Sequence, residues 1–190
     1  MSRELATRES RVGAALARAA QRDQEAFAEI VAEFQSMVFS IAFHFLRDRG
    51  TAEDVAQEVF LELYQKVSAI QSAAHLTHWL RRVAVHRSID QGRRKKHRSE
   101  LALDEAPEPS AVAAMSDPIL QGQLQETLAA LPEKQRMIVV LRYQEDLGPA
   151  EIAELMQIPV NTVKSTLHRS LEELRRLLTR RLGEIRYALF

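Results

Sequence analysis

The sequence contains no cysteine and little glycine or proline, with 6 of each of the latter among 190 residues. The absence of cysteine excludes disulfides and thiolate metal sites. No strand-like alternation of apolar and polar residues persists anywhere, so the chain is predicted to be all-helical. No apolar run approaches the roughly 20 residues of a membrane span, and the N-terminus lacks the apolar segment of a signal peptide. We therefore expect a cytoplasmic protein with no membrane insertion.

The usual signatures of catalysis are also missing. The six histidines do not fall at metal-ligand spacing with nearby acids, and there is neither a glycine-rich phosphate loop nor a GxSxG motif. His44 lies in an apolar helical pattern and is interpreted as structural. We expect no catalytic, metal-binding or cofactor-binding residue, and hence no enzyme.

Charge is balanced overall but segregated along the chain. There are 26 basic and 26 acidic residues, so the formal net charge is zero. Between residues 76 and 98 the only acid is Asp90, and the basic residues are Arg81, Arg82, Arg87, Arg93, Arg94, Lys95, Lys96 and Arg98. Residues 99–118 carry five acids and no base. Local fields steer ligands, so a neutral total can hide a site for a polyanion.

Composition and periodicity divide the chain into five segments. Residues 1–22 form an N-terminal extension, a loose helix without assigned function. Residues 23–98 form a first domain of three helices, and residues 99–116 have the composition of an acidic linker. Residues 117–182 form a second domain of short helices, and residues 183–190 are a C-terminal tail.

Local signals predict where the helices of the first domain begin and end. Asp23 is expected to cap the first helix, Gly50 to follow its end, and Thr51 to cap the second helix. The third helix is expected over about residues 78–94, preceded by a small polar loop at residues 70–75.

The segment EIAELMQIPVNTVKSTLHR, residues 151–169, predicts a helix-turn-helix. Pro159 interrupts the helical run and Asn161 is expected to cap the second helix. Apolar residues repeat at helical spacing on one side of that helix. The other side carries Asn161, Thr162, Lys164, Ser165, His168 and Arg169. A helical hairpin with a solvated face remains the alternative, but the short turn and clustered polar side chains favour DNA binding in the major groove.

The second helix of the first domain has a mixed face opposite its core side. Asp54, Gln57, Glu58 and Leu61 are spaced i, i+3, i+4 and i+7. This pattern is compatible with a solvated acidic face. It is also compatible with a docking surface for a basic partner helix, in which carboxylates surround an apolar residue.

The basic helix that follows predicts binding to single-stranded nucleic acid. Dense basic runs commonly meet phosphate, and Trp79 adds an aromatic surface beside the polar loop. Trp79 also lies at core spacing with Leu80, Val83 and Ala84, and packing in the core is interpreted as the larger part of its role.

Several motifs resemble the extracytoplasmic-function (ECF) type of sigma-70 family sigma factor, which has only regions 2 and 4. AEDVAQEVFLELYQK resembles the region 2 helix that docks on RNA polymerase, and HWLRRVAVHRSIDQGRRKK resembles the helix that recognises and melts the −10 element. LPEKQRMIVVLRY, EIAELM and IPVNTVKSTLHRSLEEL resemble region 4, which reads the −35 element.

This resemblance implies a dissociable subunit of core RNA polymerase that opens promoter DNA, with an anti-sigma factor as a further partner. The residues implied in polymerase binding are Asp54, Gln57, Glu58 and Leu61. Those implied at the single-stranded −10 element are Ser72, His75, Trp79, His86, Arg87, Asp90, Arg93 and Arg94. Those implied at duplex −35 DNA are Arg142, Asn161, Thr162, Lys164, Ser165, His168 and Arg169. The acidic linker would thread through the polymerase where RNA exits.

Four positions depart from the family pattern. Gln157 stands where glycine is usual, Asn161 where glycine or a small residue is usual, Thr166 where arginine is usual, and His86 where asparagine is common. These positions are expected near bases, so they bear on which −35 and −10 sequences are recognised and not on the fold.

Two other functional classes remain open from the residues alone. A helix-turn-helix repressor or activator acting without polymerase would need a dimerisation face or an effector pocket. An all-helical interaction module would leave the basic run at residues 81–98 unexplained.

Overall fold

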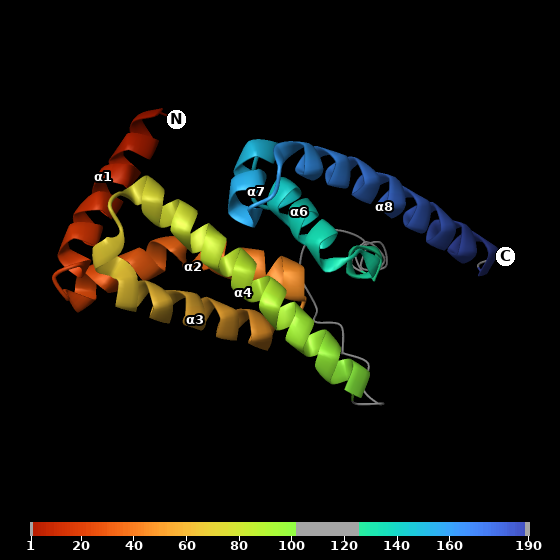
Figure 1. Ribbon diagram of the computed structural model, residues 1–190, viewed down its shortest axis with the longest axis horizontal. Helices are drawn as coiled ribbons and strands as arrows, with labels where there is room; N and C mark the ends of the chain where they lie inside the picture. The colour runs from red at the N-terminus through yellow and green to blue at the C-terminus, as the bar shows by residue number, and fades with distance from the viewer. Residues whose placement is uncertain (1, 102–125, 189–190) are drawn as a thin grey trace. The chain divides into compact units, whose positions relative to one another are not determined.

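The computed structural model describes residues 2–101 and 126–188, and its regular elements within those ranges are helices, with no strand. The chain divides into two compact units, residues 1–106 and 107–190 (Figure 1). The predicted fold class, all-helical with a helix-turn-helix in the second unit, is confirmed. Most of the predicted acidic linker, the start of the second domain at residue 117 and the last two residues of the tail lie outside the described residues.

The first unit is built around one long apolar helix. Its elements are α1 (Ser2–Ala19), α2 (Gln24–Leu46), α3 (Arg49–Lys66), the short 3-10 helix η1 (Val67–Ala69) and α4 (Ala73–Leu101). Helix α2 packs against α1, α3 and α4. Its side chains Ile30, Val38, Ile41 and Phe45 are almost completely buried, so burial of this helix supplies much of the core.

Helix α1, which the sequence left without a role, is part of this unit. Val12 and Leu16 are buried where α1 packs on α2. Arg8 and Arg11 both donate to the carboxylate of Glu33 on α2. Hydrogen bonding from Arg8 lowers the pKa of Glu33, and Arg11 acts in the same direction. Apolar burial and paired charge thus fix α1 on α2.

Length and composition alone would allow α2 to cross a membrane. An 18-residue window of this 23-residue helix has a mean hydropathy of 1.4, which corrects the expectation that no apolar segment of this size exists. The core helix of a soluble protein passes the same test. Contacts with three other helices account for the apolar face of α2.

The boundary between α2 and α3 differs from the prediction. Asp23 caps α2 as expected, accepting from the backbone N–H of Ala26 at 3.1 Å. Arg47, with φ of 60°, takes the left-handed position that ends α2, and Gly50 lies inside α3. Asp48 caps α3 by accepting from the N–H of Thr51 at 2.7 Å. The predictions for Gly50 and Thr51 were therefore wrong, because Asp48 already satisfies the exposed amide of Thr51 and starts the helix earlier.

Helix α4 also begins earlier than predicted. The hydroxyl of Ser72 accepts from the N–H of His75 at 3.1 Å, so Ser72 caps a helix that starts at Ala73. The predicted loop is thus reduced to the residues before Ala73. Farther along α4, Gly92 lets the helix approach α2, because a Cβ there would lie 3.0 Å from the Phe45 ring.

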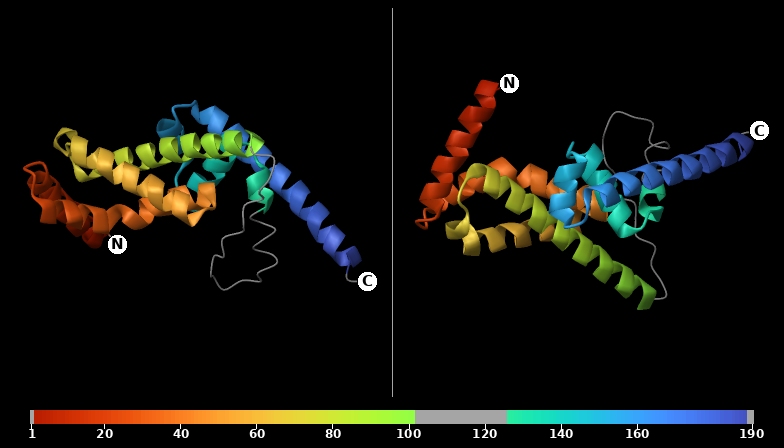
Figure 2. Two further views of the ribbon diagram at one scale, coloured as in Figure 1. Left: turned by 90° about the horizontal axis from the view of Figure 1, so that it is seen from below. Right: turned by 45° about the horizontal axis from the view of Figure 1, so that its top comes forward.

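The second unit contains α6 (Glu133–Tyr143), α7 (Pro149–Met156) and α8 (Val160–Ala188). Helix α8 packs against both α6 and α7 and continues well past them (Figure 2). The predicted end near Tyr143 and the predicted start at Gly148-Pro149 are confirmed. The carboxylate of Glu151 accepts from the N–H of Gly148 at 2.7 Å and so stabilises the start of α7.

The turn between α7 and α8 explains one departure from the family pattern. Gln157 has φ of 54°, a left-handed conformation that glycine adopts without a Cβ penalty. Helix α8 begins at Val160, and the carbonyl of Pro159 accepts from the N–H of Thr162 at 2.9 Å. The prediction that Asn161 caps this helix was therefore wrong, because Asn161 lies within its first turn.

Candidate functional site

Helix α3 exposes the four residues that the sequence assigned to a docking stripe. Asp54, Gln57, Glu58 and Leu61 are all exposed. Leu61 is 63% exposed, the largest value among the exposed large apolar residues of the described chain. An exposed leucine beside carboxylates has the chemistry of a contact site for an apolar and basic partner.

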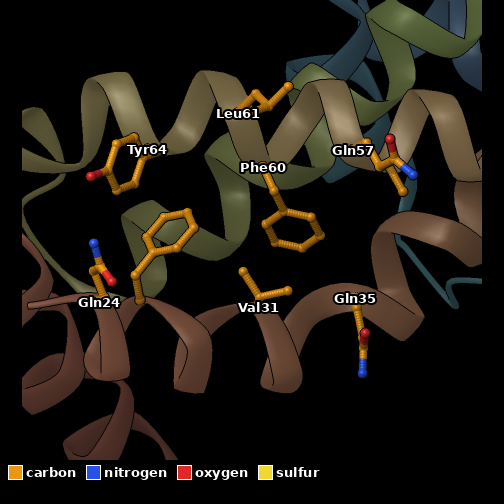
Figure 3. A pocket seen from close by; sticks show the side chains of 9 residues that line it. Gln24, Val31, Gln35, Gln57, Phe60, Leu61 and Tyr64 are labelled. Carbon is orange, nitrogen blue, oxygen red and sulfur yellow. The ribbon is translucent and has the colours of Figure 1, made fainter.

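A groove with a volume of about 610 Å³ lies beside this stripe, between α2 and α3 (Figure 3). Its lining residues are Gln24, Phe27, Val31, Gln35, Ala56, Gln57, Phe60, Leu61 and Tyr64. Figure 3 shows Phe60 pointing into the groove toward Val31, whereas Leu61 lies on the outer side of α3. The groove therefore extends the docking stripe with an apolar floor.

Tyr64 is a groove residue that sequence reasoning missed. Its ring meets Phe27 edge-to-face at 5.1 Å, and the guanidinium of Arg22 lies 5.7 Å from its centroid. The signal was present in the sequence, because Tyr64 follows Leu61 by three residues and so continues the same helical face.

Helix α4 presents an outer face that differs from its core side. Leu80 and Ala84 are fully buried, whereas Trp79 and His86 are half-buried. Trp79 and His86 are seven residues apart, and this spacing places them on the same face of a helix. Arg82 lies on this face too and is exposed, although it was not among the predicted contacts. Trp79 is thus partly accessible while most of its surface is buried, which is compatible with packing as the larger part of its role.

The remaining predicted residues of the −10 site lie at three different places. Ser72 and His75 are exposed in the cap and first turn of α4. Asp90, Arg93 and Arg94 are exposed, and the guanidinium of Arg93 lies 3.9 Å from the carboxylate of Asp90. Arg87 does not lie on the outer face, because its guanidinium contacts Glu58 and Glu62 of α3.

Lys95 makes a similar connection to α3. Its ammonium lies 3.2 Å from the carboxylate of Asp48. Hydrogen bonds from Thr51, and then from Lys95, lower the pKa of Asp48 to about 2. Arg87 is therefore held by two acids of α3 and Lys95 by Asp48, the cap of α3. The exposed arginines of the basic run among the described side chains are Arg82, Arg93 and Arg94.

Helix α8 exposes the polar residues of its first two turns. The exposed side chains are Asn161, Thr162, Lys164, Ser165, His168 and Arg169. The hydroxyl of Ser165 donates to the carbonyl of Thr162 at 3.1 Å, and Arg169 donates to the carbonyl of Ser165 at 3.2 Å. His168 lies 3.3 Å from the carboxylate of Glu172. These six residues share one outward side of the second helix of a helix-turn-helix.

Two other positions of the second unit behave differently. Thr166 is buried, so this departure from the family pattern faces the interior, and the expectation that it lies near bases was wrong. Arg142 donates to the carbonyl of Leu147 at 3.3 Å and also lies 3.4 Å from Asp146. It therefore ties down the loop between α6 and α7.

The described residues contain no group of three or more His, Asp or Glu side chains that could hold a metal ion. The candidate surfaces of this part of the chain are an acidic and apolar face on α3, an aromatic and basic face on α4, and the exposed start of α8.

Comparison with known protein families shows which family has these two helical units. Residues 30–98 match the family Sigma-70 region 2, and residues 121–174 match Sigma-70, region 4. The ECF RNA polymerase sigma factor SigW of Bacillus subtilis is 31% identical over 172 residues, which cover 82% of this chain and 90% of SigW. The chain belongs to the ECF sigma factors of the sigma-70 family. It has a sigma factor role in transcription initiation, and the alternative of a regulator acting without polymerase is not supported.

Further similarities agree with this assignment. The ECF sigma factor SigK of Mycobacterium tuberculosis is 30% identical over 176 residues, covering 89% of this chain and 94% of SigK. Among solved structures, CnrH in complex with the cytosolic domain of CnrY superposes with a TM-score of 0.64 at 23% identity, covering 87% of this chain and 95% of that one. The sigma factor RpoE in complex with the anti-sigma factor NepR from Bartonella quintana gives 0.67 at 18% identity, covering 80% and 96%. These two likenesses confirm the fold.

Proposed function

We propose that the first unit of this ECF sigma factor carries two separate binding surfaces, one for core RNA polymerase and one for the −10 strand. The exposed stripe of α3, formed by Asp54, Gln57, Glu58 and Leu61, docks on the polymerase. The exposure of Leu61 supports this role, because a leucine that is 63% exposed beside carboxylates contributes little to the core of the unit.

The outer face of α4 takes the non-duplex −10 strand. Trp79 offers a half-buried aromatic surface on which a base can stack, and Arg82 and Arg93 offer exposed cations for the backbone. Asp90 and Arg94 lie beside them on the same helix. His86 lies on the face of Trp79, so it is placed to contribute to the choice of base.

Ser72 and His75 support strand binding from the start of α4. Their side chains are exposed, but Ser72 also caps the helix. We propose that they hold the first turn of α4 in place beside Trp79.

The first two turns of α8 read the −35 duplex in the major groove. Asn161, Thr162 and Ser165 are nearest the helix start and face base edges, whereas Lys164 and Arg169 contact phosphates. His168 lies on the same exposed side, one turn after Lys164. Arg142 supports this reading indirectly, because its hydrogen bond to the Leu147 carbonyl holds the loop that precedes α7.

Partners and location follow from the family. We propose that an anti-sigma factor also binds this chain, because similar structures were determined with NepR, an anti-sigma factor, and with the cytosolic domain of CnrY. Sigma factors are generally not enzymes, and we infer that this one acts in the cytoplasm without catalytic chemistry or a cofactor of its own.

Reconstitution with core RNA polymerase tests the proposal. Run-off transcription on genomic fragments, followed by mapping of start sites, should give discrete promoters that core polymerase alone does not use. Permanganate reactivity of thymines near −10 should fall in the Trp79→Ala and Arg82→Ala proteins while polymerase binding persists. Normal reactivity in both variants would place strand capture elsewhere on the protein.

A further inference from the structure

Arg87 belongs to the basic run of α4, yet its side chain is held by α3. Its Nη2 donates to Glu62 Oε2 at 2.7 Å, its Nε donates to the same oxygen at 3.2 Å, and its Nη1 donates to Glu58. The side chain is 35% exposed. Consecutive residues of an α-helix are rotated by about 100°, so Arg87 points well away from its neighbour His86 on the outer face.

The two glutamates that hold Arg87 are in different states. Glu62 is 21% exposed, and its other oxygen accepts from Lys66 at 2.7 Å. These contacts, first with Lys66 and then with Arg87, lower the pKa of Glu62. Glu58 is 52% exposed and gives only one oxygen to Arg87. Both oxygens of Glu62 thus accept hydrogen bonds within the unit, whereas Glu58 has one oxygen that can accept from a partner.

The planar guanidinium of Arg87 suits this arrangement. It spans two carboxylates with separate N–H groups, which a lysine ammonium cannot reproduce with the same fixed geometry. A side chain held in its bound conformation loses less freedom when a partner arrives. Arg87 therefore fixes the direction of the Glu58 carboxylate within the docking stripe.

We infer that Arg87 is a positioning residue for the polymerase-docking face of α3, acting through Glu58 and Glu62, and that it makes no contact with promoter DNA. This inference rests on the proposed function of the α3 stripe. It changes the role that the sequence suggested for Arg87, from strand binding on α4 to support of the opposite surface.

A charge exchange distinguishes the two roles. The variants are Arg87→Glu, Glu62→Arg and the double exchange, each tested as a full chain for affinity to core polymerase and for binding of a single-stranded −10 oligonucleotide at saturating core. Arg87→Glu brings three carboxylates together and should lower core affinity about tenfold. The double exchange rebuilds an interhelix ion pair and should restore core affinity to within about threefold of the unsubstituted protein. Oligonucleotide binding at saturating core should be unchanged in all three.

Arg87→Lys provides a second test that adds no carboxylate beside Glu58 and Glu62. A lysine can still bind phosphate, so a DNA contact would survive this change. If Arg87 instead bridges two carboxylates, lysine would not preserve that geometry. Core affinity should then fall about threefold while oligonucleotide binding stays unchanged. Thermal unfolding of each variant checks that the unit is folded.

Several outcomes would overturn the inference. Loss of oligonucleotide binding in both Arg87→Glu and the double exchange would show that Arg87 meets DNA. Recovery of thermal stability without recovery of core affinity in the double exchange would show that Arg87 only joins α3 to α4. Arg82→Glu and Leu61→Ala are the matched controls, because they should affect only strand binding and only core binding, respectively. If neither control changes its readout, the proposed surfaces fail independently of Arg87.

Discussion

Truncation of Leu61 is the sharpest perturbation of the docking surface. Complete burial of a leucine side chain is worth about 1.5–3 kcal/mol. Leu61 is 63% exposed in the free protein, so covering that exposed part on the polymerase would recover about 1–2 kcal/mol. Leu61→Ala should therefore raise the dissociation constant for core polymerase about 5- to 30-fold.

The fold should not change, because an exposed side chain contributes little to the core. The free energy of unfolding should stay within about 0.5 kcal/mol of the original. Leu63→Ala, two residues along the same helix, is the contrast, because Leu63 is fully buried and its truncation should cost about 2–5 kcal/mol.

Equilibrium binding of labelled protein to core polymerase measures the effect, with thermal unfolding run in parallel. Leu171→Ala is the matched control, since Leu171 is also an exposed leucine but lies on α8. Equal affinities for the original protein and Leu61→Ala would refute the assignment of α3. A similar loss in both leucine variants would show a general sensitivity to exposed apolar surface.

Three further predictions concern stability and DNA binding. Gln157→Gly should raise the melting temperature in thermal unfolding, because relief of the left-handed backbone is worth about 1 kcal/mol; a lower value would show that the Gln157 side chain contributes more than its backbone costs. Asp48→Asn keeps the helix cap but loses the charge paired with Lys95. The pKa of Asp48 is lowered from 3.8 to about 2 in the folded state, so its stabilisation is complete above the unfolded value and is lost as pH falls toward the folded value. The carboxylate is 40% exposed, so the stability difference in pH-dependent melting should be only about 1 kcal/mol or less near neutrality and vanish between about pH 4 and pH 2; a difference that persists at low pH would contradict this. Lys164→Ala should lower the slope of log affinity against log salt by about one unit, and an unchanged slope would remove Lys164 from the phosphate contacts.

Much of the fold could be predicted because helical periodicity and turn chemistry are local. The cap at Asp23, the end of α6 near Tyr143 and the start of α7 at Gly148-Pro149 were predicted from short stretches of sequence and are present in the structure. The errors at Gly50 and Thr51 arose where several capping residues compete within a few positions. At such a boundary, the capping residue is the one whose side chain hydrogen-bonds to the free N–H groups of the first turn, and sequence alone does not show which one that is.

The candidate surfaces divide in the same way. Spacing alone placed Asp54 and Leu61 on one exposed face of α3, and the structure agrees with that exposure. The burial of Thr166 and the partial accessibility of Trp79 could not be read from spacing. Periodicity gives the angle of a side chain around its own helix, but burial depends on where the neighbouring helices lie.

The sequence by itself determined the helical class, the helix-turn-helix and the segregation of acidic and basic segments, because each of these depends on residues close together in the chain. Only the tertiary structure decided that Arg87 turns toward α3 and that a groove opens between α2 and α3. Arg87 and Glu62 are 25 residues apart. An ion pair or a groove between helices requires their relative position, which is set by packing of the buried side chains of α2, α3 and α4 rather than by any local pattern.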